Sequence, residues 1–254
     1  MQMQLTPKKH IFLWLMVALL VSACASQQQV QKDKEGVRAR AQAHTNLGAA
    51  YYQQGKLDIA LEEFNLAVES DPTYAFAFNG LGLVNAALKQ DKEANEYFNR
   101  AIALEPNNSE AHNNLGNFLC SRGRYDESIK EYLTAVKNPL YATPALAYTN
   151  AGVCSARKKD LNSAELYYKK ALEVDPLNQQ AAYQLATLQF QRKEAEAAYK
   201  TLQNVLVTKA SPEILLLAIN ITRSLNMKQA EREARMQLFQ LYPNSEQVKK
   251  LQAE

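Results

Sequence analysis

Residues 75–106 read AFAFNGLGLVNAALKQDKEANEYFNRAIALEP, and the pattern inside this stretch returns before and after it. The dipeptides that mark it are Leu47-Gly48, Leu81-Gly82, Leu115-Gly116 and Ala151-Gly152, at intervals of 34, 34 and 36 residues. A fixed period of this length is typical of a solenoid in which each unit is a short helical hairpin.

A second set of residues recurs further along each unit, where a small residue is followed by an aromatic one and then by Ala. The four copies are Ala60, Phe64, Ala67; Ala94, Phe98, Ala101; Ser128, Tyr132, Ala135; and Ala164, Tyr168, Ala171. These spacings of four and three lie on one face of a helix. Pro72, Pro106 and Pro176 follow this second helix and end it. Each unit therefore predicts two antiparallel helices that bury their apolar faces by stacking on neighbouring units.

This pattern resembles the tetratricopeptide repeat. The consensus residues are reproduced by Leu47, Gly48, Tyr51, Gly55, Ala60, Phe64, Ala67 and Pro72. The resemblance implies an all-α, right-handed solenoid of about five to six helix pairs over residues 37–254, with degenerate last copies at residues 179–210 and 211–242. The segment EILLLAINI in the last copy is too short for a membrane span and is expected in the core.

The N-terminus carries a targeting signal. Lys8 and Lys9 precede the apolar run Ile11–Val21, which is shorter than the roughly 20 residues of a transmembrane helix. The next residues, Val21-Ser22-Ala23-Cys24, resemble a bacterial lipobox. That resemblance implies a signal peptide over residues 1–23, a lipid on Cys24 that can anchor the chain and, with Ala25 next, the outer membrane. An ordinary secretory peptide with an incidental Cys is the alternative.

The segment 24–36 contains ASQQQVQKDKEG and has no apolar periodicity, which predicts a lipid anchor followed by a flexible tether. We expect the first helix of the repeat domain to begin between Val37 and Ala43.

Cys120 and Cys154 lie 34 residues apart, in the first helices of the third and fourth units. Such helices should pack side by side, and an exported protein meets an oxidising environment, so we expect a disulfide. Two buried free thiols are the alternative. No second pair of ligands accompanies the two cysteines, so a metal site is not expected.

Composition and motifs point away from catalysis. The net charge of the whole chain is +3. After removal of residues 1–23, 27 basic and 26 acidic residues remain, which gives a net charge of +1. No basic patch suggests that the chain binds nucleic acid. His44 and His112 stand where the repeat consensus has a bulky aromatic, so we interpret them as packing residues. No nucleophile elbow, phosphate loop or HExxH motif occurs. We expect no enzyme activity, no cofactor and no small-molecule substrate.

A binding function remains, and the repeat resemblance implies its place. The first helices line a concave groove, and the matching positions include Tyr52, Gln53, Phe76, Asn79, Leu83, Asn113 and Asn117. Aromatic and aliphatic anchors beside amides suit an extended or helical apolar peptide. The carboxylate clamp of some relatives is not reproduced, because Thr45, Asn79 and Asn113 replace its basic residue.

The lipobox, the Gln-rich segment, the repeats and the two cysteines together resemble the PilW/PilF family of type IV pilus biogenesis lipoproteins. The resemblance implies a non-enzymatic pilotin on the periplasmic face of the outer membrane, whose partner is the pilus secretin. The alternative is a periplasmic adaptor for peptidoglycan hydrolases or for outer-membrane assembly factors.

Overall fold

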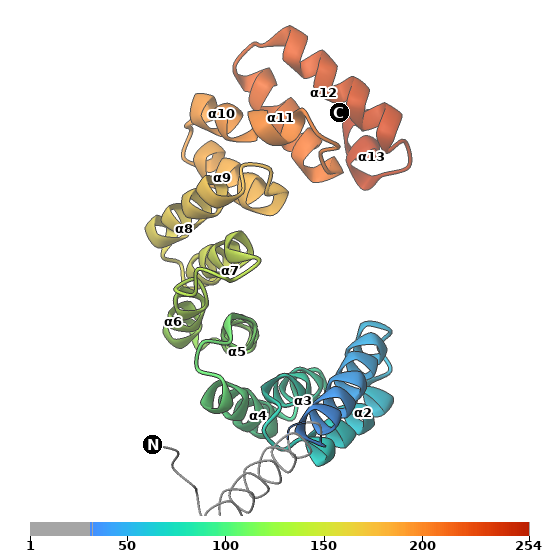
Figure 1. The fold of residues 1–254 in the computed structure, drawn as a ribbon. Helices are drawn as coiled ribbons and strands as arrows, with labels where there is room; N and C mark the ends of the chain where they lie inside the picture. Colours follow the sequence, from blue (N-terminus) through green and yellow to red (C-terminus); the bar gives the residue numbers. More distant parts are fainter. Residues whose placement is uncertain (1–30, 32, 254) are drawn as a thin grey trace, which may run out of the picture. The chain divides into compact units, whose positions relative to one another are not determined.

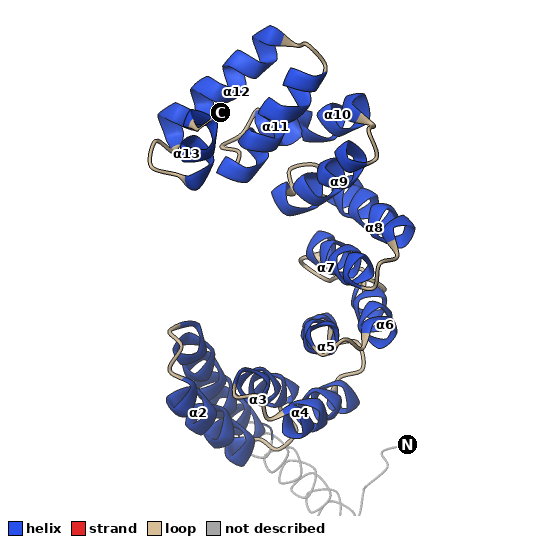
Figure 2. Ribbon diagram, turned by 180° about the vertical axis from the view of Figure 1, so that it is seen from behind, coloured by secondary structure: helices blue, strands red, loops and turns tan. Residues whose placement is uncertain are grey.

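The computed structural model describes residue 31 and residues 33–253, and within that range the chain forms helices joined by turns, with no strand (Figure 2). The chain divides into two units, one ending at Pro106 and one beginning at Asn107. Each unit consists of tetratricopeptide-type helix pairs, coloured along the sequence in Figure 1.

Unit 1 contains two helix pairs. The first helix covers residues 33–53 and is followed by α2, Leu57–Ser70. The second pair is α3, Ala75–Ala87, and α4, Asp91–Leu104. Gly55 in the first turn has a φ of +74°, a left-handed conformation that glycine adopts without steric cost.

The core of unit 1 is organised around the ring of Phe64 on α2. A Cβ built on Gly48 of the first helix would lie 2.9 Å from Cδ1 of Phe64, and one built on Gly80 of α3 would lie closer still. Both helices therefore approach one ring because each presents a glycine to it. Ala41, Ala67 and Ala77 form a buried cluster of this unit together with Tyr74.

Unit 2 contains four helix pairs and a final short helix. The pairs are α5 Ser109–Ser121 with α6 Tyr125–Ala135, α7 Pro144–Arg157 with α8 Leu161–Val174, α9 Gln179–Gln191 with α10 Ala195–Leu206, and α11 Pro212–Ser224 with α12 Lys228–Leu241. The second helix of each pair packs against the first helix of the next, as α6 does on α7 and α8 on α9. This succession is the stacking that the repeat pattern predicts.

Side-chain caps start several of these helices. Asn108, Asn178 and Ser211 accept hydrogen bonds from the backbone N–H groups of Ala111, Ala181 and Ile214, three residues further on. Such caps satisfy donors that the first turn of a helix leaves without a partner. Pro144 and Pro212 occupy the first turn, where no amide donor is needed.

The last helix pair has a core of aliphatic side chains. Ile214, Leu215 and Ile219 on α11 are at most 1% exposed, as expected for the EILLLAINI segment. None of the described helices is long and apolar enough to cross a membrane.

Two details of the ends differ from the sequence-based expectation. The first helix already includes residues 33–36, which we expected in the flexible tether, because Asp33, Lys34 and Glu35 are compatible with a helix that packs from Ala41 onward. The polar C-terminal tail forms α13, Glu246–Gln252, because Val248 and Leu251 bury their side chains against the last pair. Residues 1–30, with the expected signal peptide, Cys24 and most of the tether, lie outside the described range.

Candidate functional site

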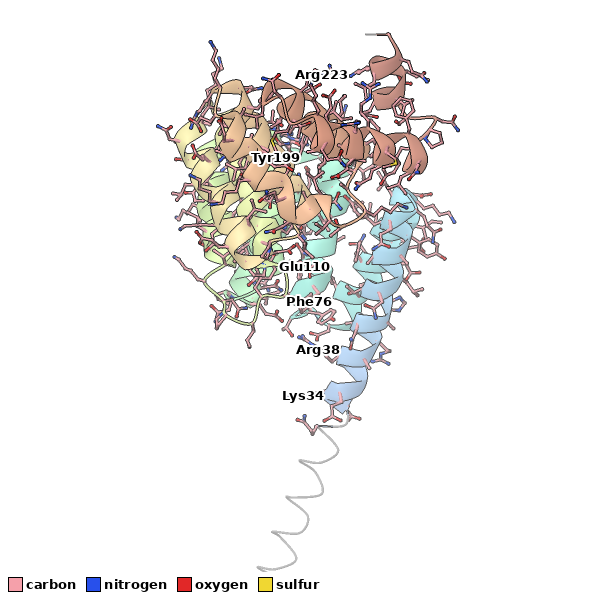
Figure 3. All side chains as sticks on the ribbon, turned by 90° about the horizontal axis from the view of Figure 1, so that it is seen from above. Lys34, Arg38, Phe76, Glu110, Tyr199 and Arg223 are labelled. Atoms are coloured by element: carbon pink, nitrogen blue, oxygen red, sulfur yellow. A yellow bond between two sulfur atoms is a disulfide. The ribbon has the colours of Figure 1, made fainter. Side chains whose placement is uncertain are left out.

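The groove residues expected in unit 1 come from two helices. Tyr52 and Gln53 end the first helix, while Phe76, Asn79 and Leu83 lie on α3 at spacings of three and four, which share one helix face. Figure 3 labels Phe76 near the start of α3.

The exposure of these side chains separates them into accessible and enclosed groups. Phe76 is 37% exposed and Leu83 is half-buried, so both can bury further apolar surface when a partner binds. Gln53 is exposed and Tyr52 half-buried. Asn79 is only 4% exposed, so its amide lies beneath this surface rather than on it.

The two groove residues of unit 2 lie on α5 and are already engaged with other side chains. Asn113 is buried, and its Oδ1 accepts a hydrogen bond from Nδ2 of Asn150 on α7 at 3.2 Å. Asn117 is exposed, and its Oδ1 accepts from the hydroxyl of Tyr132 at 2.8 Å. Asn117 therefore offers its NH₂ group to a ligand. Asn113 belongs to a side-chain network that joins α5 to α7.

Tyr132 fixes the orientation of Asn117. Burial raises the pKa of Tyr132 to about 12, so its hydroxyl keeps its proton and remains a donor near neutral pH. The repeat pattern treats Phe and Tyr as equivalent at this place, so sequence reasoning missed the role of the hydroxyl. The Asn150 partner was missed as well, because it lies one place beyond the matching groove position.

Two histidine–carboxylate pairs occur at the same place in different repeats. Nδ1 of His44 lies 2.8 Å from Glu63, and Nδ1 of His112 lies 2.6 Å from Glu131. Both pairs are 19 residues apart and join the first helix of a repeat to the second. The interpretation of these histidines as packing residues was therefore incomplete, and the recurring separation was the signal that it missed.

Cys120 and Cys154 form a disulfide between α5 and α7, with their Cα atoms 5.8 Å apart. That separation is within the usual range for a bridge. Cys154 is fully buried and Cys120 is 6% exposed, in a cluster with Tyr132 and Ala151. The bridge is a structural link within unit 2.

The described residues contain no group of three or more His, Cys, Asp or Glu side chains that could hold a metal ion. None of the family models that match this chain indicates a catalytic family.

Comparisons with known proteins agree on the repeat. Models of the tetratricopeptide repeat match residues 48–89, 75–108, 97–130 and 145–176. The type IV pilus assembly protein PilF of Pseudomonas aeruginosa is 26% identical over 252 residues, which are 98% of this chain and 100% of that relative. An uncharacterised protein of Haemophilus influenzae is 26% identical over 61% of this chain and 82% of its own length.

Two solved structures support the same relationship. The structure of Pseudomonas aeruginosa PilF aligns with a TM-score of 0.70 at 27% identity, over 86% of this chain and 99% of that one. The crystal structure of PilW, described as a widely conserved type IV pilus biogenesis factor, aligns with a TM-score of 0.64 at 29% identity, over 83% of this chain and 97% of that one.

The chain carries tetratricopeptide repeats over residues 48–130 and 145–176. It is related to the type IV pilus biogenesis factors PilF and PilW over most of its length.

Proposed function

We propose that the chain is a non-enzymatic pilotin, which binds the type IV pilus secretin and assists its assembly in the outer membrane. The observation that carries the proposal is the relationship to PilF over 98% of the chain, because it includes the N-terminal segment as well as the repeats. Lipidation of Cys24 and retention at the periplasmic face of the outer membrane are parts of the same proposal, and they rest on the lipobox-like sequence.

The accessible face of α3 supports a protein partner. Phe76 and Leu83 present aromatic and aliphatic surface on a rigid helix, and partly exposed apolar side chains of this kind are common anchors in protein interfaces. A secretin subunit exposes apolar segments before it inserts into the membrane. A membrane-anchored groove raises the effective concentration of such a partner without requiring tight intrinsic binding.

Leu83→Asp tests this assignment. A carboxylate placed in an apolar contact without a partner is costly to desolvate, so the variant should capture less secretin and leave fewer detergent-resistant secretin multimers. Leu88→Asp is the matched control, because Leu88 is 40% exposed at the end of the same helix and outside the groove positions. Circular dichroism should show intact helices in both variants.

A strain that lacks the protein gives the decisive result. Normal secretin multimers and normal pili in that strain would contradict the pilotin role. A defect in peptidoglycan cleavage or in other outer-membrane proteins would instead support the adaptor function.

A further inference from the structure

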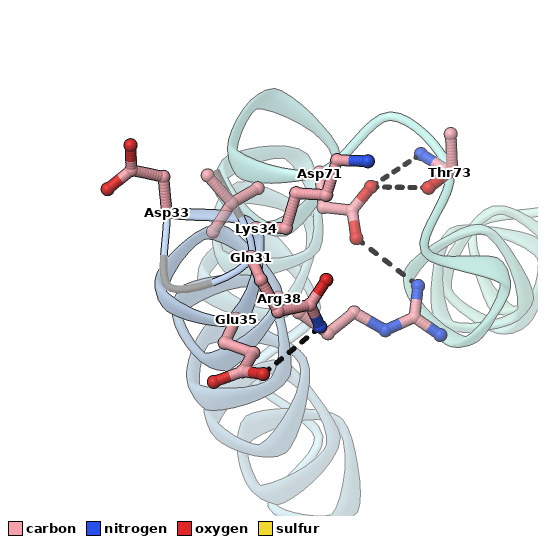
Figure 4. A pocket seen from close by; sticks show the side chains of 8 residues that line it. Gln31, Asp33, Lys34, Glu35, Arg38, Asp71 and Thr73 are labelled. Carbon is pink, nitrogen blue, oxygen red and sulfur yellow. Dashed lines mark hydrogen bonds and ion pairs between the residues drawn. The ribbon is translucent and has the colours of Figure 1, made fainter. Parts of the chain in front are cut away.

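One arginine of the first helix joins three segments of unit 1. The guanidinium of Arg38 donates to Oδ2 of Asp71 at 3.2 Å and to Oε1 of Glu105 at 3.4 Å. Asp71 ends α2 and Glu105 ends α4, so the partners of Arg38 are 33 and 67 residues away in the sequence. Figure 4 shows the contact with Asp71.

The carboxylate of Asp71 is held from its other side. The backbone N–H and the hydroxyl of Thr73 donate to Oδ1 of Asp71 at 2.9 and 2.6 Å. Burial alone would raise the pKa of Asp71, but the hydrogen bonds from Thr73 and Arg38 outweigh burial and lower it. Asp71 therefore stays ionised and fixes the turn between α2 and α3.

The same guanidinium lies over the ring of the next residue in that turn, Tyr74. The distance from Cζ of Arg38 to the ring centroid is 4.3 Å, within the range of a cation–π contact. Tyr74 is 8% exposed, and its ring contacts the ring of Phe76 with centroids 5.5 Å apart and planes 43° apart. Arg38, Tyr74 and Phe76 thus form a stack that ends at the accessible groove residue.

We propose that Arg38 is a positioning residue for partner binding, which acts by holding Tyr74 and, through it, the ring of Phe76 in the groove. The inference rests on the proposed function, because it assigns Phe76 a contact with the partner. A ring fixed before binding loses less conformational entropy when the partner arrives. The guanidinium of Arg38 and the buried ring of Tyr74 supply that restraint.

A single indole can report on this stack. The chain has one tryptophan, Trp14, so the double substitution W14F/F76W places the only indole of the full chain at the groove position. Removal of the guanidinium by Arg38→Met should change the emission maximum of that indole and increase its quenching by acrylamide. Arg38→Lys keeps a positive charge near Asp71 and should restore part of the signal. Arg40→Met changes an exposed arginine of the same helix and is the matched control.

Capture of the purified periplasmic part of the pilus secretin gives the second readout. With Phe76 in place, Arg38→Met should weaken capture about two- to fivefold, which corresponds to roughly 0.4 to 1 kcal/mol at 1.4 kcal/mol per tenfold. Arg38→Lys should fall between Arg38→Met and the unchanged chain, and Arg40→Met should have no effect.

The two readouts separate the inference from the function on which it rests. The positioning role would be overturned if Arg38→Met left the emission and quenching of the indole unchanged. It would also be overturned if the indole signal changed while secretin capture did not. If the unchanged chain fails to capture the secretin, the pilotin function is wrong, while the indole signal still decides whether Arg38 orders the ring.

Discussion

Gly82 on α3 faces the ring of Phe98 on α4 so closely that a Cβ built on the glycine would lie 2.6 Å from Cδ1 of that ring. Phe98 is fully buried, so a shift of the ring would have to displace neighbouring core atoms. The same relationship joins Gly116 to Tyr132 and Gly152 to Tyr168. The recurring spacing of the glycine and the aromatic residue in this repeat therefore reflects one direct packing contact between the two helices.

Gly82→Ala should lower the free energy of unfolding by about 1 to 3 kcal/mol, the usual cost of forcing an extra carbon into a packed core. Urea unfolding measures the effect. Gly36→Ala is the control, because Gly36 is also helical and a Cβ there meets nothing within 4 Å. That control should be neutral or slightly stabilising, since Ala favours a helix more than Gly does. Equal effects of the two substitutions would refute the close-contact explanation.

The disulfide gives the second prediction. Removal of the bridge in a Cys120→Ala/Cys154→Ala variant should cost about 3 to 4 kcal/mol in the chain-entropy model for a loop of this length. Urea unfolding of the variant against the oxidised protein measures this difference. Peptide mapping without reductant should find Cys120 joined to Cys154, and two free thiols in periplasmically produced protein would contradict the bridge.

Alkaline pH should destabilise the fold through two buried tyrosines. Burial raises the pKa of Tyr132 and of Tyr168 from 10.0 to about 12. Between pH 10 and 12 the unfolded chain therefore loses protons that the folded chain retains. The contribution of each tyrosine to the free energy of unfolding is about 2 to 3 kcal/mol. This contribution is fully present below pH 10 and is lost as the pH rises through 12.

Denaturant unfolding at several pH values between 10 and 12 measures how much the free energy of unfolding falls. Tyr168→Phe should remove its share of the loss, because phenylalanine has no ionisable group. A stability that stays constant from pH 10 to 12 in the unchanged protein would show that these hydroxyls ionise equally in both states.

The anchor gives a prediction that concerns location alone. Cys24→Ala should leave the helices intact, because position 24 precedes the repeats in the sequence, and the protein should leave the outer-membrane fraction. Membrane fractionation followed by a high-salt wash tests this. Retention of the variant in the washed membrane pellet would contradict the lipid anchor.

The sequence predicts the helix pairs because the repeat contact uses few residues at fixed spacing. Gly82, Ala94 and Phe98 can be placed against one another from the period alone. Exposure within the groove is harder to predict, because the helical register gives the face of Asn79 and Asn113 but not the depth at which their amides lie. Arg38 shows a further limit, since its partners are 33 and 67 residues away and no local pattern links them.

The C-terminal helix α13 is also not predicted from the sequence. Only two apolar residues, Val248 and Leu251, distinguish this segment from a polar tail. Their burial depends on the end of the last helix pair, which is a surface formed only in the folded chain.

The histidine–carboxylate pairs give the last prediction, because the repeat formed by α3 and α4 has an aromatic pair at the same place. Phe78 and Tyr97 occupy the places of His112 and Glu131 in that repeat, with ring centroids 6.4 Å apart. His112→Phe alone leaves the carboxylate of Glu131, 19% exposed, without its hydrogen bond, and should cost about 1 to 3 kcal/mol.

The double substitution His112→Phe/Glu131→Tyr should recover much of that loss, because it recreates an aromatic pair already present in the chain. Urea unfolding of the two single variants and the double variant forms a thermodynamic cycle, and strictly additive effects would show that the pair is not coupled. His44→Phe should cost less than His112→Phe, since the side chain of His44 is 33% exposed and that of His112 only 9%. Glu63 and Glu131 are both 19% exposed, so the expected difference comes from the histidine position, where water reaches the place of the His44 side chain more easily.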